Sequence, residues 1–494
     1  MDISNSNIEK WLQPDYPNSD QYCHRKFLPC PMTKKTEESN LWSLVKSNTG
    51  KDLSKTTMPI NLNEPISFLQ RISEYMEYSN LLFQASLEND PINRLELITT
   101  FVISDVSSTY KRSGKPFNPL LGETFELNRK EERGYIFVSE QVSHHPPISA
   151  FYVEAEPYFR FWGSLYPKLQ FWGKSLEIYP KGNLYIHLLD INEVYTWENV
   201  PSVINNLLIG KVNICHQGEN TIKCLTTNTK AVLKWKSDGW FKIGEDCSRN
   251  RLEAHLYNKH SEKVKVIYGR WNEVLFSVSA DDWKLRNEKK LWRTPLTDSS
   301  VTGVVSKLGN LRFFPSSSFH IMQPSSLEVP DSSPGNHNCT SPIDCKKINP
   351  GSSSCASSPT SSEEIDLHLP HQNFLWKVSP RPPHSRLYYD FTYFTMILNE
   401  VPRDYYSELP PSDSRKRPDI RLLENGNIDD ASKEKSRLEN KQRQTRKQFK
   451  TKKCSQECQA LWFDLKESEY SNIPEWVFNG KYFQRNWEIC PDIF

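Results

Sequence analysis

The stretch Glu140-Gln141-Val142-Ser143-His144-His145-Pro146-Pro147 places two adjacent imidazoles directly before two prolines. Each proline restricts its own backbone and that of the preceding residue to extended or turn conformations. The two rings are thereby aimed in fixed directions, which is typical of a binding site and not of a filler loop. The alternative is a pair of histidines that bond to backbone carbonyls at the end of a strand.

Three kinds of chemistry could use the histidine pair. A metal site is disfavoured because neighbouring residues of an extended chain point in different directions, and metal-binding histidines are usually spaced further apart. A hydrolase is disfavoured because a nucleophile and its base usually come from distant positions, and no Gly-x-Ser-x-Gly elbow surrounds Ser143. Imidazole N–H groups can instead donate to the oxygens of a phosphate. Anion binding is therefore the functional interpretation, without a metal, cofactor or catalytic residue.

Further stretches in the same order along the chain resemble the oxysterol-binding protein family. They are residues 115–123 (KPFNPLLGE), 171–175 (FWGKS) and 409–415 (LPPSDSR), followed by the run from Arg417 to the basic segment that ends near Arg446. The resemblance covers about residues 28–494 apart from one insert. It is strongest to the short members of the subgroup that contains oxysterol-binding protein-related proteins one and two.

The resemblance implies an α+β, mainly β, fold. A large incomplete antiparallel β-barrel would surround a lipid tunnel, with an N-terminal lid, N-terminal helices and a C-terminal helical subdomain. We expect a flexible N-terminal arm at residues 1–27 and one lipid-binding domain at 28–494. Within the domain we expect a lid at 38–50, helices at 63–113, the barrel at 117–400, a disordered insert at 295–369 and the C-terminal subdomain at 401–494.

The residue pattern favours the same architecture. Asn63-Glu64-Pro65 predicts the start of a helix, and a second helix is expected from Pro91 to a point before Gly114. From Tyr135 to about Val278, short β-prone runs separated by turn signals predict sequential hairpins and an antiparallel sheet. Many strands without alternating helices favour a barrel, which the aromatic runs at 374–376 and 387–398 would close.

The predicted insert differs sharply in composition from the rest of the chain. It holds 18 serines between Ser299 and Ser362 together with frequent prolines. So few apolar residues cannot offset the entropy lost on ordering, which predicts disorder. Within the insert, residues 311–316 (LRFFPS) faintly resemble the paired-phenylalanine motif by which relatives tether to the endoplasmic reticulum, although the acidic flank is missing.

Composition limits the partners and the compartment. The net charge of +2 excludes a global attraction to nucleic acid. The 11 cysteines form an odd, scattered set without a CxxC pair, which indicates reduced thiols in the cytosol. The N-terminus lacks the parts of a signal peptide, and no apolar run reaches the roughly 18 residues of a membrane span. We therefore expect a cytoplasmic protein that touches membranes only peripherally.

The most basic segment lies near the C-terminal end of the sequence. Residues 431–453 contain ten Lys or Arg against two Glu, which predicts a surface helix that could also attract anionic membrane surfaces. Lys435, Glu439 and Arg443 are spaced i, i+4 and i+8, so they share one face over about 12 Å. One interpretation is a ladder of ion pairs within the helix. The family resemblance implies instead that these residues face a lipid headgroup beside the histidine pair.

The resemblance assigns a site and a function. The phosphoinositide headgroup would be bound by Lys115, Asn118, His144, His145, Lys435, Glu439 and Arg443. The lid would cover the tunnel with Trp42, Leu44 and Val45. The implied function is lipid transfer: sterol and phosphoinositide would bind in one tunnel and be exchanged between membranes. The alternative is a sensor or scaffold that binds either lipid without net transport, whereas an enzyme is disfavoured.

Overall fold

The computed structural model describes residues 5–14, 25–32, 59–112, 114–172, 175–205, 213–235, 250–289, 369, 371–401, 403–451 and 460–494. The predicted lid and all of the predicted insert except residue 369 lie outside these ranges. The chain divides into two compact units, Met1–Leu285 with His368–Phe494, and Arg286–Leu367. In the second unit only residues 286–289 are described, as the end of a helix.

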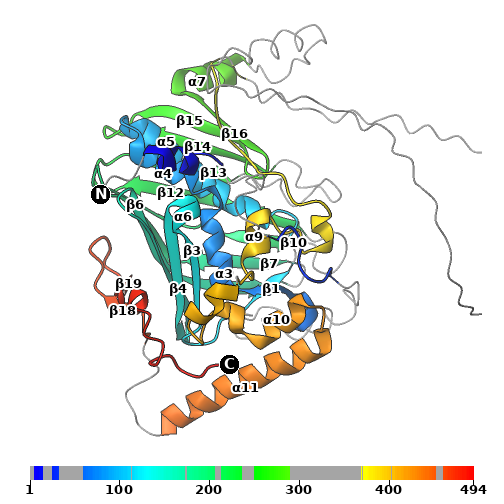
Figure 1. The fold of residues 1–494 in the computed structure, drawn as a ribbon. Helices are drawn as coiled ribbons and strands as arrows, with labels where there is room; N and C mark the ends of the chain where they lie inside the picture. Colours follow the sequence, from blue (N-terminus) through cyan, green and yellow to red (C-terminus); the bar gives the residue numbers. More distant parts are fainter. Residues whose placement is uncertain are drawn as a thin grey trace, which may run out of the picture. The chain divides into compact units, whose positions relative to one another are not determined.

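The secondary structure of the described residues combines one large sheet with short helices and one long helix (Figure 1). The helices are α1 (Asn5–Trp11), α3 (Phe68–Ser73), α4 (Asn80–Leu87), α5 (Pro91–Asp105), α6 (Lys130–Arg133), α7 (Ala280–Lys289), α9 (Tyr393–Ile397), α10 (Pro418–Glu424) and α11 (Ile428–Thr451). Two small sheets pair β1 (Asn63–Ser67) with β2 (Lys115–Phe117), and β18 (Phe463–Lys466) with β19 (Glu475–Phe478).

Fifteen described strands form the large sheet, and every pairing in it is antiparallel. The strands are β3 (Thr124–Arg129), β4 (Tyr135–His144), β5 (Pro147–Ala155), β6 (Phe159–Phe171), β7 (Leu176–Lys181), β8 (Asn183–Leu188), β9 (Glu193–Glu198), β10 (Ser202–Asn205), β11 (Asn213–His216), β12 (Gly218–Cys224), β13 (Lys230–Trp235), β14 (Arg251–Tyr257), β15 (Lys263–Arg270), β16 (Val274–Ser279) and β17 (Asn373–Lys377). The predicted succession of hairpins is therefore confirmed.

The sheet is a meander whose strands are broken along one line. β7 and β8 keep a single register on β6, because Tyr166 pairs with Lys181 and Gly163 pairs with Leu184 on either side of Gly182. The same line separates β9 from β10, at residues 199–201, and β11 from β12, at Gln217. Gly182 has a φ of +117°, and a Cβ there would meet the carbonyl oxygen of Ser164 at 1.8 Å. Only glycine fits this break.

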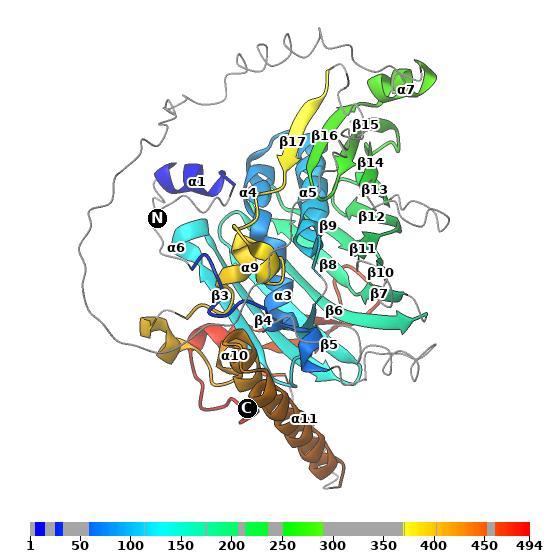
Figure 2. The same ribbon diagram turned by 90° about the vertical axis from the view of Figure 1, so that its right-hand side faces the viewer.

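The helices α3, α4 and α5 pack against one face of the sheet (Figure 2). Their apolar residues, such as Leu69, Phe83 and Phe101, share one core with the inward residues Phe151 and Phe161 of β5 and β6. α5 starts as predicted, since Pro91 is its first residue and the side chain of Asp90 accepts from the backbone N–H groups of the first turn. This layer holds the strands that carry the candidate site.

The first predicted helix was placed too early in the sequence. Asn63-Glu64-Pro65 belongs to β1, whose residues Asn63 and Ser67 pair with Lys115 and Phe117 of β2 in parallel. The helix α3 begins only at Phe68, and Ser67 and Gln70 form its capping box. A pairing between residues about 50 positions apart therefore overrides the local cap signal.

The N-terminal prediction also needs correction. Residues 5–14 do not behave as a flexible arm, because α1 forms and Trp11 is buried against Phe83 and Tyr158. The indole also covers Gly134, where a Cβ would approach the ring to 2.7 Å. The two apolar side chains among the seven residues of α1 form too weak a pattern to show this, because the residues that receive Trp11 are distant in sequence.

The large sheet branches at β6, so that β3, β17 and β11 are its terminal strands, and β3 does not pair with β17 among the described residues. The run at residues 374–376 extends the sheet as β17, as predicted, but 387–398 forms turns and α9 instead of a strand. The sheet is therefore large and antiparallel, while closure into a barrel stays a prediction. Within the described residues, no helix is long and apolar enough to cross a bilayer.

Candidate functional site

The histidine pair lies in the turn between β4 and β5. His144 pairs with Pro147, so only His145 and Pro146 connect the strands, and the His145–Pro146 peptide bond is cis. Ser143 Oγ donates to the carbonyl of Pro146 at 2.7 Å. The backbone and side-chain bonds of the hairpin thus fix the turn, and the Ser143 hydroxyl is engaged with the backbone and not with an imidazole.

A second set of contacts braces the same turn from within the sheet. Gln141 Nε2 donates to the carbonyl of Ser143 at 2.8 Å, and Ser149 Oγ donates to Gln141 Oε1 at 2.5 Å. The pairing shifts between Gln141 and Ser143, which marks a bulge just before the histidines. The imidazoles therefore sit on a backbone whose direction is set by several side chains.

The two rings lie close together, contrary to the expectation that they splay apart. Their centroids are 4.6 Å apart at an interplanar angle of 66°. Burial lowers the pKa of His144 to about 4, and the nearby charges of His145 and Arg446 lower it further in the same direction. His144 is therefore neutral at pH 7, and its Nδ1 is buried without a hydrogen-bond partner among the described residues. No cluster of metal-ligating residues is found in the same part of the chain.

Lys115 and Asn118 lie on and after β2. Asn63 Nδ2 donates to the carbonyl of Lys115 at 3.0 Å, and Arg417 Nη1 donates to the carbonyl of Asn118 at 2.8 Å. The side chain of Lys115 is half-buried and that of Asn118 is exposed. Burial, followed by repulsion from Lys435, lowers the pKa of Lys115 to about 8 against the opposing attraction of Glu439. Lys115 is thus close to α11 and still mostly protonated at pH 7.

The helix α11 contributes the other charged residues. Glu439 lies between two cations, 3.4 Å from Lys435 Nζ and 3.9 Å from Arg443 Nη2. Lys435 is 8% exposed, whereas the side chain of Arg443 is 64% exposed. The predicted ladder of ion pairs therefore forms, and its buried end lies close enough to Lys115 to act on its pKa. That these residues also face a lipid headgroup stays a prediction.

The position of α11 follows from its apolar start. Ala431 packs in one cluster with Ile60, Phe117 and the α10 residues Ile420 and Leu423. Phe117 is two residues after Lys115, so the same cluster fixes β2 and α11 relative to each other. Beyond this cluster most of the helix is exposed, as predicted from its composition.

The motif residues outside the predicted site have a structural role. Glu123 is buried and accepts from Ser67 Oγ at 2.5 Å, from Ser414 Oγ at 2.7 Å and from Arg417 Nη1 at 2.8 Å. It thereby joins the stretch at 115–123 to the stretch at 409–415. Removing one partner of such a buried ion pair typically costs about 3–5 kcal/mol.

Glu140 has the same kind of role on the other side of β4. Its carboxylate is fully buried and accepts the backbone N–H groups of Leu461 and Trp462 at 2.8 and 2.9 Å. Burial nevertheless raises its pKa to about 7, against these two bonds. Glu140 therefore attaches the segment before β18 to the strand that carries the histidines.

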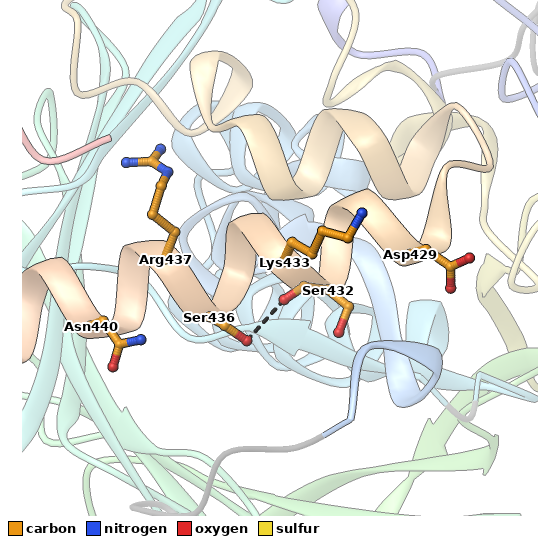
Figure 3. A pocket seen from close by; sticks show the side chains of 6 residues that line it. All are labelled: Asp429, Ser432, Lys433, Ser436, Arg437 and Asn440. Carbon is orange, nitrogen blue, oxygen red and sulfur yellow. Dashed lines mark hydrogen bonds between the residues drawn. The ribbon is translucent and has the colours of Figure 1, made fainter.

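A hollow of about 740 Å³ lies along the outer face of α11 (Figure 3). It is lined by Asp429, Ser432, Lys433, Ser436, Arg437 and Asn440. Lys433 Nζ lies 2.8 Å from Asp430, and Arg437 Nη2 lies 2.8 Å from Glu434. Since its cations are paired, this face offers little charge to an anion.

A second hollow of about 430 Å³ lies elsewhere in the fold. It is lined by Arg25, Asn399, Glu400, Val401, Tyr406, Arg415, Lys416 and Arg421. Neither of these two hollows is bounded by the face of the large sheet, so neither is the predicted lipid tunnel. The lid residues Trp42, Leu44 and Val45 lie outside the described residues.

The structure thus gathers Lys115, Lys435, Glu439 and Arg443 on one side, and His144 and His145 with Arg446 on the other. Arg446 was not among the predicted site residues. The sequence spacing could have identified it, because Arg446 follows Lys435 by 11 residues, or three helical turns, and so lies on the same side of the helix. That these residues hold a headgroup stays a prediction.

The comparison with known proteins identifies the family. Residues 40–487 match the model of the family described as oxysterol-binding protein. The chain belongs to the oxysterol-binding protein family. Members of this family bind lipids and are not enzymes.

Two curated relatives support the predicted subgroup of the oxysterol-binding protein family. The chain is 39% identical over 475 residues to oxysterol-binding protein-related protein 1 of Rattus norvegicus, covering 95% of this chain and 44% of the relative. It is 39% identical over 474 residues to oxysterol-binding protein-related protein 2 of Mus musculus, covering 95% and 88%. The chain therefore spans less than half the length of the first of these relatives.

Two crystal structures of the same family share the fold. The Osh1 ORD domain in complex with cholesterol has a TM-score of 0.71 at 28% identity, covering 96% of this chain and 95% of that chain. The Osh3 ORD from Saccharomyces cerevisiae in complex with PI(4)P has a TM-score of 0.66 at 26% identity, covering 95% and 98%. The mainly β, α+β fold is thereby confirmed.

Proposed function

We propose that the protein binds a sterol or a phosphoinositide in one tunnel and exchanges these lipids between membranes. The observation that carries the proposal is that β2 and the β4–β5 turn both lie close to α11, since Lys435 acts on the charge of Lys115 and Arg446 acts on that of His144. The related Osh1 and Osh3 domains hold cholesterol and PI(4)P, respectively. The proposal therefore assigns both lipids to the fold that this chain shares with these domains.

The proposed headgroup site consists of the seven predicted residues Lys115, Asn118, His144, His145, Lys435, Glu439 and Arg443. The neutral imidazole of His144 can donate to a phosphate oxygen without the cost of burying a charge, while the lysines and the arginine supply the opposite charge. Glu439 orients the cations on either side of it. A sterol carries no phosphate, so its binding does not depend on this site.

The lid formed by Trp42, Leu44 and Val45 completes the proposed tunnel. A sterol that exposes on the order of 400 Å² of apolar surface would lose about 10 kcal/mol in water. A carrier therefore has to shield the lipid during transfer. Contact with the membrane would be peripheral, and residues 311–316 would tether the protein to the endoplasmic reticulum.

The decisive experiment replaces both His144 and His145 by Ala. We expect the variant to lose extraction of PI(4)P from liposomes and to keep sterol uptake within about twofold of the wild type, since only the headgroup contacts are removed. His260→Ala, in the exposed turn between β14 and β15, is the matched control. Extraction of both lipids at the wild-type rate by the double variant would show that the site is assigned wrongly.

The sensor or scaffold interpretation is separated by a transfer assay between two liposome populations. A carrier moves many lipid molecules per protein molecule, and sterol moves in one direction as PI(4)P moves in the other. A sensor binds lipid stoichiometrically and produces no turnover. Stoichiometric binding by the wild-type protein would therefore favour the sensor.

A further inference from the structure

The buried face of α11 continues past the residues assigned to the site. Ala431, Lys435 and Leu438 are at most 8% exposed, so they mark the side of the helix that faces the protein. At 3.6 residues per turn, positions 7 and 11 residues after Lys435 lie within about 20° of it around the helix axis. These positions are Gln442 and Arg446, whereas Arg443 lies about 80° away.

Gln442 has an unsatisfied polar group on this side. Its amide nitrogen is buried and has no hydrogen-bond partner among the described residues. A buried polar group without a partner destabilises a folded protein, so its presence calls for an explanation such as a functional role or a bound group that the protein atoms do not supply. The amide lies between the Lys435 and Arg446 positions, on the same line along the helix.

Arg446 extends the line to the histidine side of the site. Its side chain is exposed, and its charge acts on the imidazole of His144. Figures 1 and 2 both place the lower end of β4 beside the C-terminal half of α11. Arg446 is therefore the α11 cation whose charge reaches the histidine turn.

A count of charges indicates that the assigned site is incomplete. With His144 neutral, and before any contribution of His145, the charged side chains of Lys115, Lys435 and Arg443 against that of Glu439 give three positive charges and one negative charge, a net +2. A headgroup with one phosphomonoester and one phosphodiester carries about −2.5 to −3 at pH 7. Adding Arg446 raises the site to +3, which matches this charge.

We propose that Gln442 and Arg446 complete the headgroup site, with Arg446 binding the phosphomonoester next to His144 and Gln442 donating its amide N–H to the same headgroup. This inference rests on the proposed function, because it names further contacts of the same phosphorylated inositol. It assigns specificity for the headgroup to the line Lys435, Gln442 and Arg446. Arg443 then acts mainly from the exposed rim.

The test measures binding of free inositol 1,4-bisphosphate by calorimetry and extraction of PI(4)P from phosphatidylcholine vesicles. The soluble headgroup separates recognition of phosphate from attraction to a membrane surface. Arg446→Gln should weaken both by about 10- to 100-fold, as expected for the loss of a charge-assisted hydrogen bond. Sterol uptake from phosphatidylcholine vesicles should not change. Arg437→Gln, on the outer face and paired with Glu434, is the control with the same charge change.

Gln442→Leu provides a signature that a purely structural role would not give. The variant should bind the headgroup severalfold more weakly and yet unfold at the same or a higher temperature without ligand, because an unsatisfied buried group is removed. Equal headgroup binding by Arg446→Gln and Arg437→Gln, or unchanged binding by Gln442→Leu, overturns the inference. If the wild-type protein binds neither the headgroup nor PI(4)P, the proposed function itself fails.

Discussion

The two sides of the candidate site are built in different ways. The β4–β5 turn is fixed by strand pairing and by the hydrogen bonds of Gln141, Ser143 and Ser149, and its His144 is neutral. The helix α11 is attached along one apolar edge and carries most of the charge on flexible side chains. The turn thus supplies geometry with little charge, and the helix supplies charge with looser geometry. A phosphorylated ligand needs both.

The largest effect on the helix side should come from Lys435→Ala. Lys435 is nearly buried and balances Glu439, so its loss leaves a carboxylate facing the anion. We expect PI(4)P affinity to fall by about 100-fold. Lys433→Ala removes the same charge from the outer face, where Lys433 is paired with Asp430, and should change affinity less than about twofold (Figure 3). Equal losses in the two variants would mean that general charge, and not the inner face, binds the headgroup.

A smaller effect is expected from the titration of Lys115. Its pKa of about 8 means that the ammonium loses its proton as the pH rises above 8, and an anion prefers the protonated form. Headgroup affinity should therefore be constant near pH 7 and fall by up to about tenfold per pH unit above pH 8. Lys115→Met should bind more weakly at pH 7 and lose this slope. If the slope persists in Lys115→Met, another group titrates.

The smallest effect on binding is expected from Glu140→Gln, because Glu140 does not belong to the proposed headgroup site. The variant tests instead how this buried carboxylate affects the stability of the side that carries the histidine turn. The folded pKa of about 7 lies above the ordinary value of 4.5, so the folded state holds the proton more tightly than the unfolded state. The stabilisation is complete below about pH 4.5 and is lost as the pH rises through 7. The wild type should lose about 2–3 kcal/mol between pH 5 and 8 relative to Glu140→Gln in urea denaturation. Parallel pH profiles of the two proteins would contradict this assignment.

The sequence predicted local features and missed those made by distant partners. The hairpins and the start of α5 follow from alternating residues, turns and the Asp90-Pro91 cap. The sequence predicts a helix at residues 63–65 because β2, which pairs with β1, lies about 50 residues away and gives no local sign. Trp11 was assigned to a flexible arm because Phe83 and Tyr158, which receive it, give no local sign.

The same limit applies to the candidate site. The i, i+4, i+8 spacing correctly predicted that Lys435, Glu439 and Arg443 share a helix face, and the ion pairs show that they interact. The spacing could not show which side of that face is buried. The burial of Lys435 and Leu438 shows that the inner side of the helix runs towards Gln442 and Arg446 and not towards Arg443. Spacing therefore defines a face, while packing decides which of its residues can reach a ligand.

The aligned breaks in the sheet at Gly182, at 199–201 and at Gln217 have a mechanical consequence. Because the interruptions fall on one line, the strand pairing is discontinuous along that line. Fewer backbone hydrogen bonds resist bending of the sheet there. We expect the branch formed by β7, β10 and β11 to bend along this line more easily than the rest of the sheet, with the unbroken strand β6 as its attachment. An alanine at Gly182 would clash with the carbonyl of Ser164 and force the sheet open along this line.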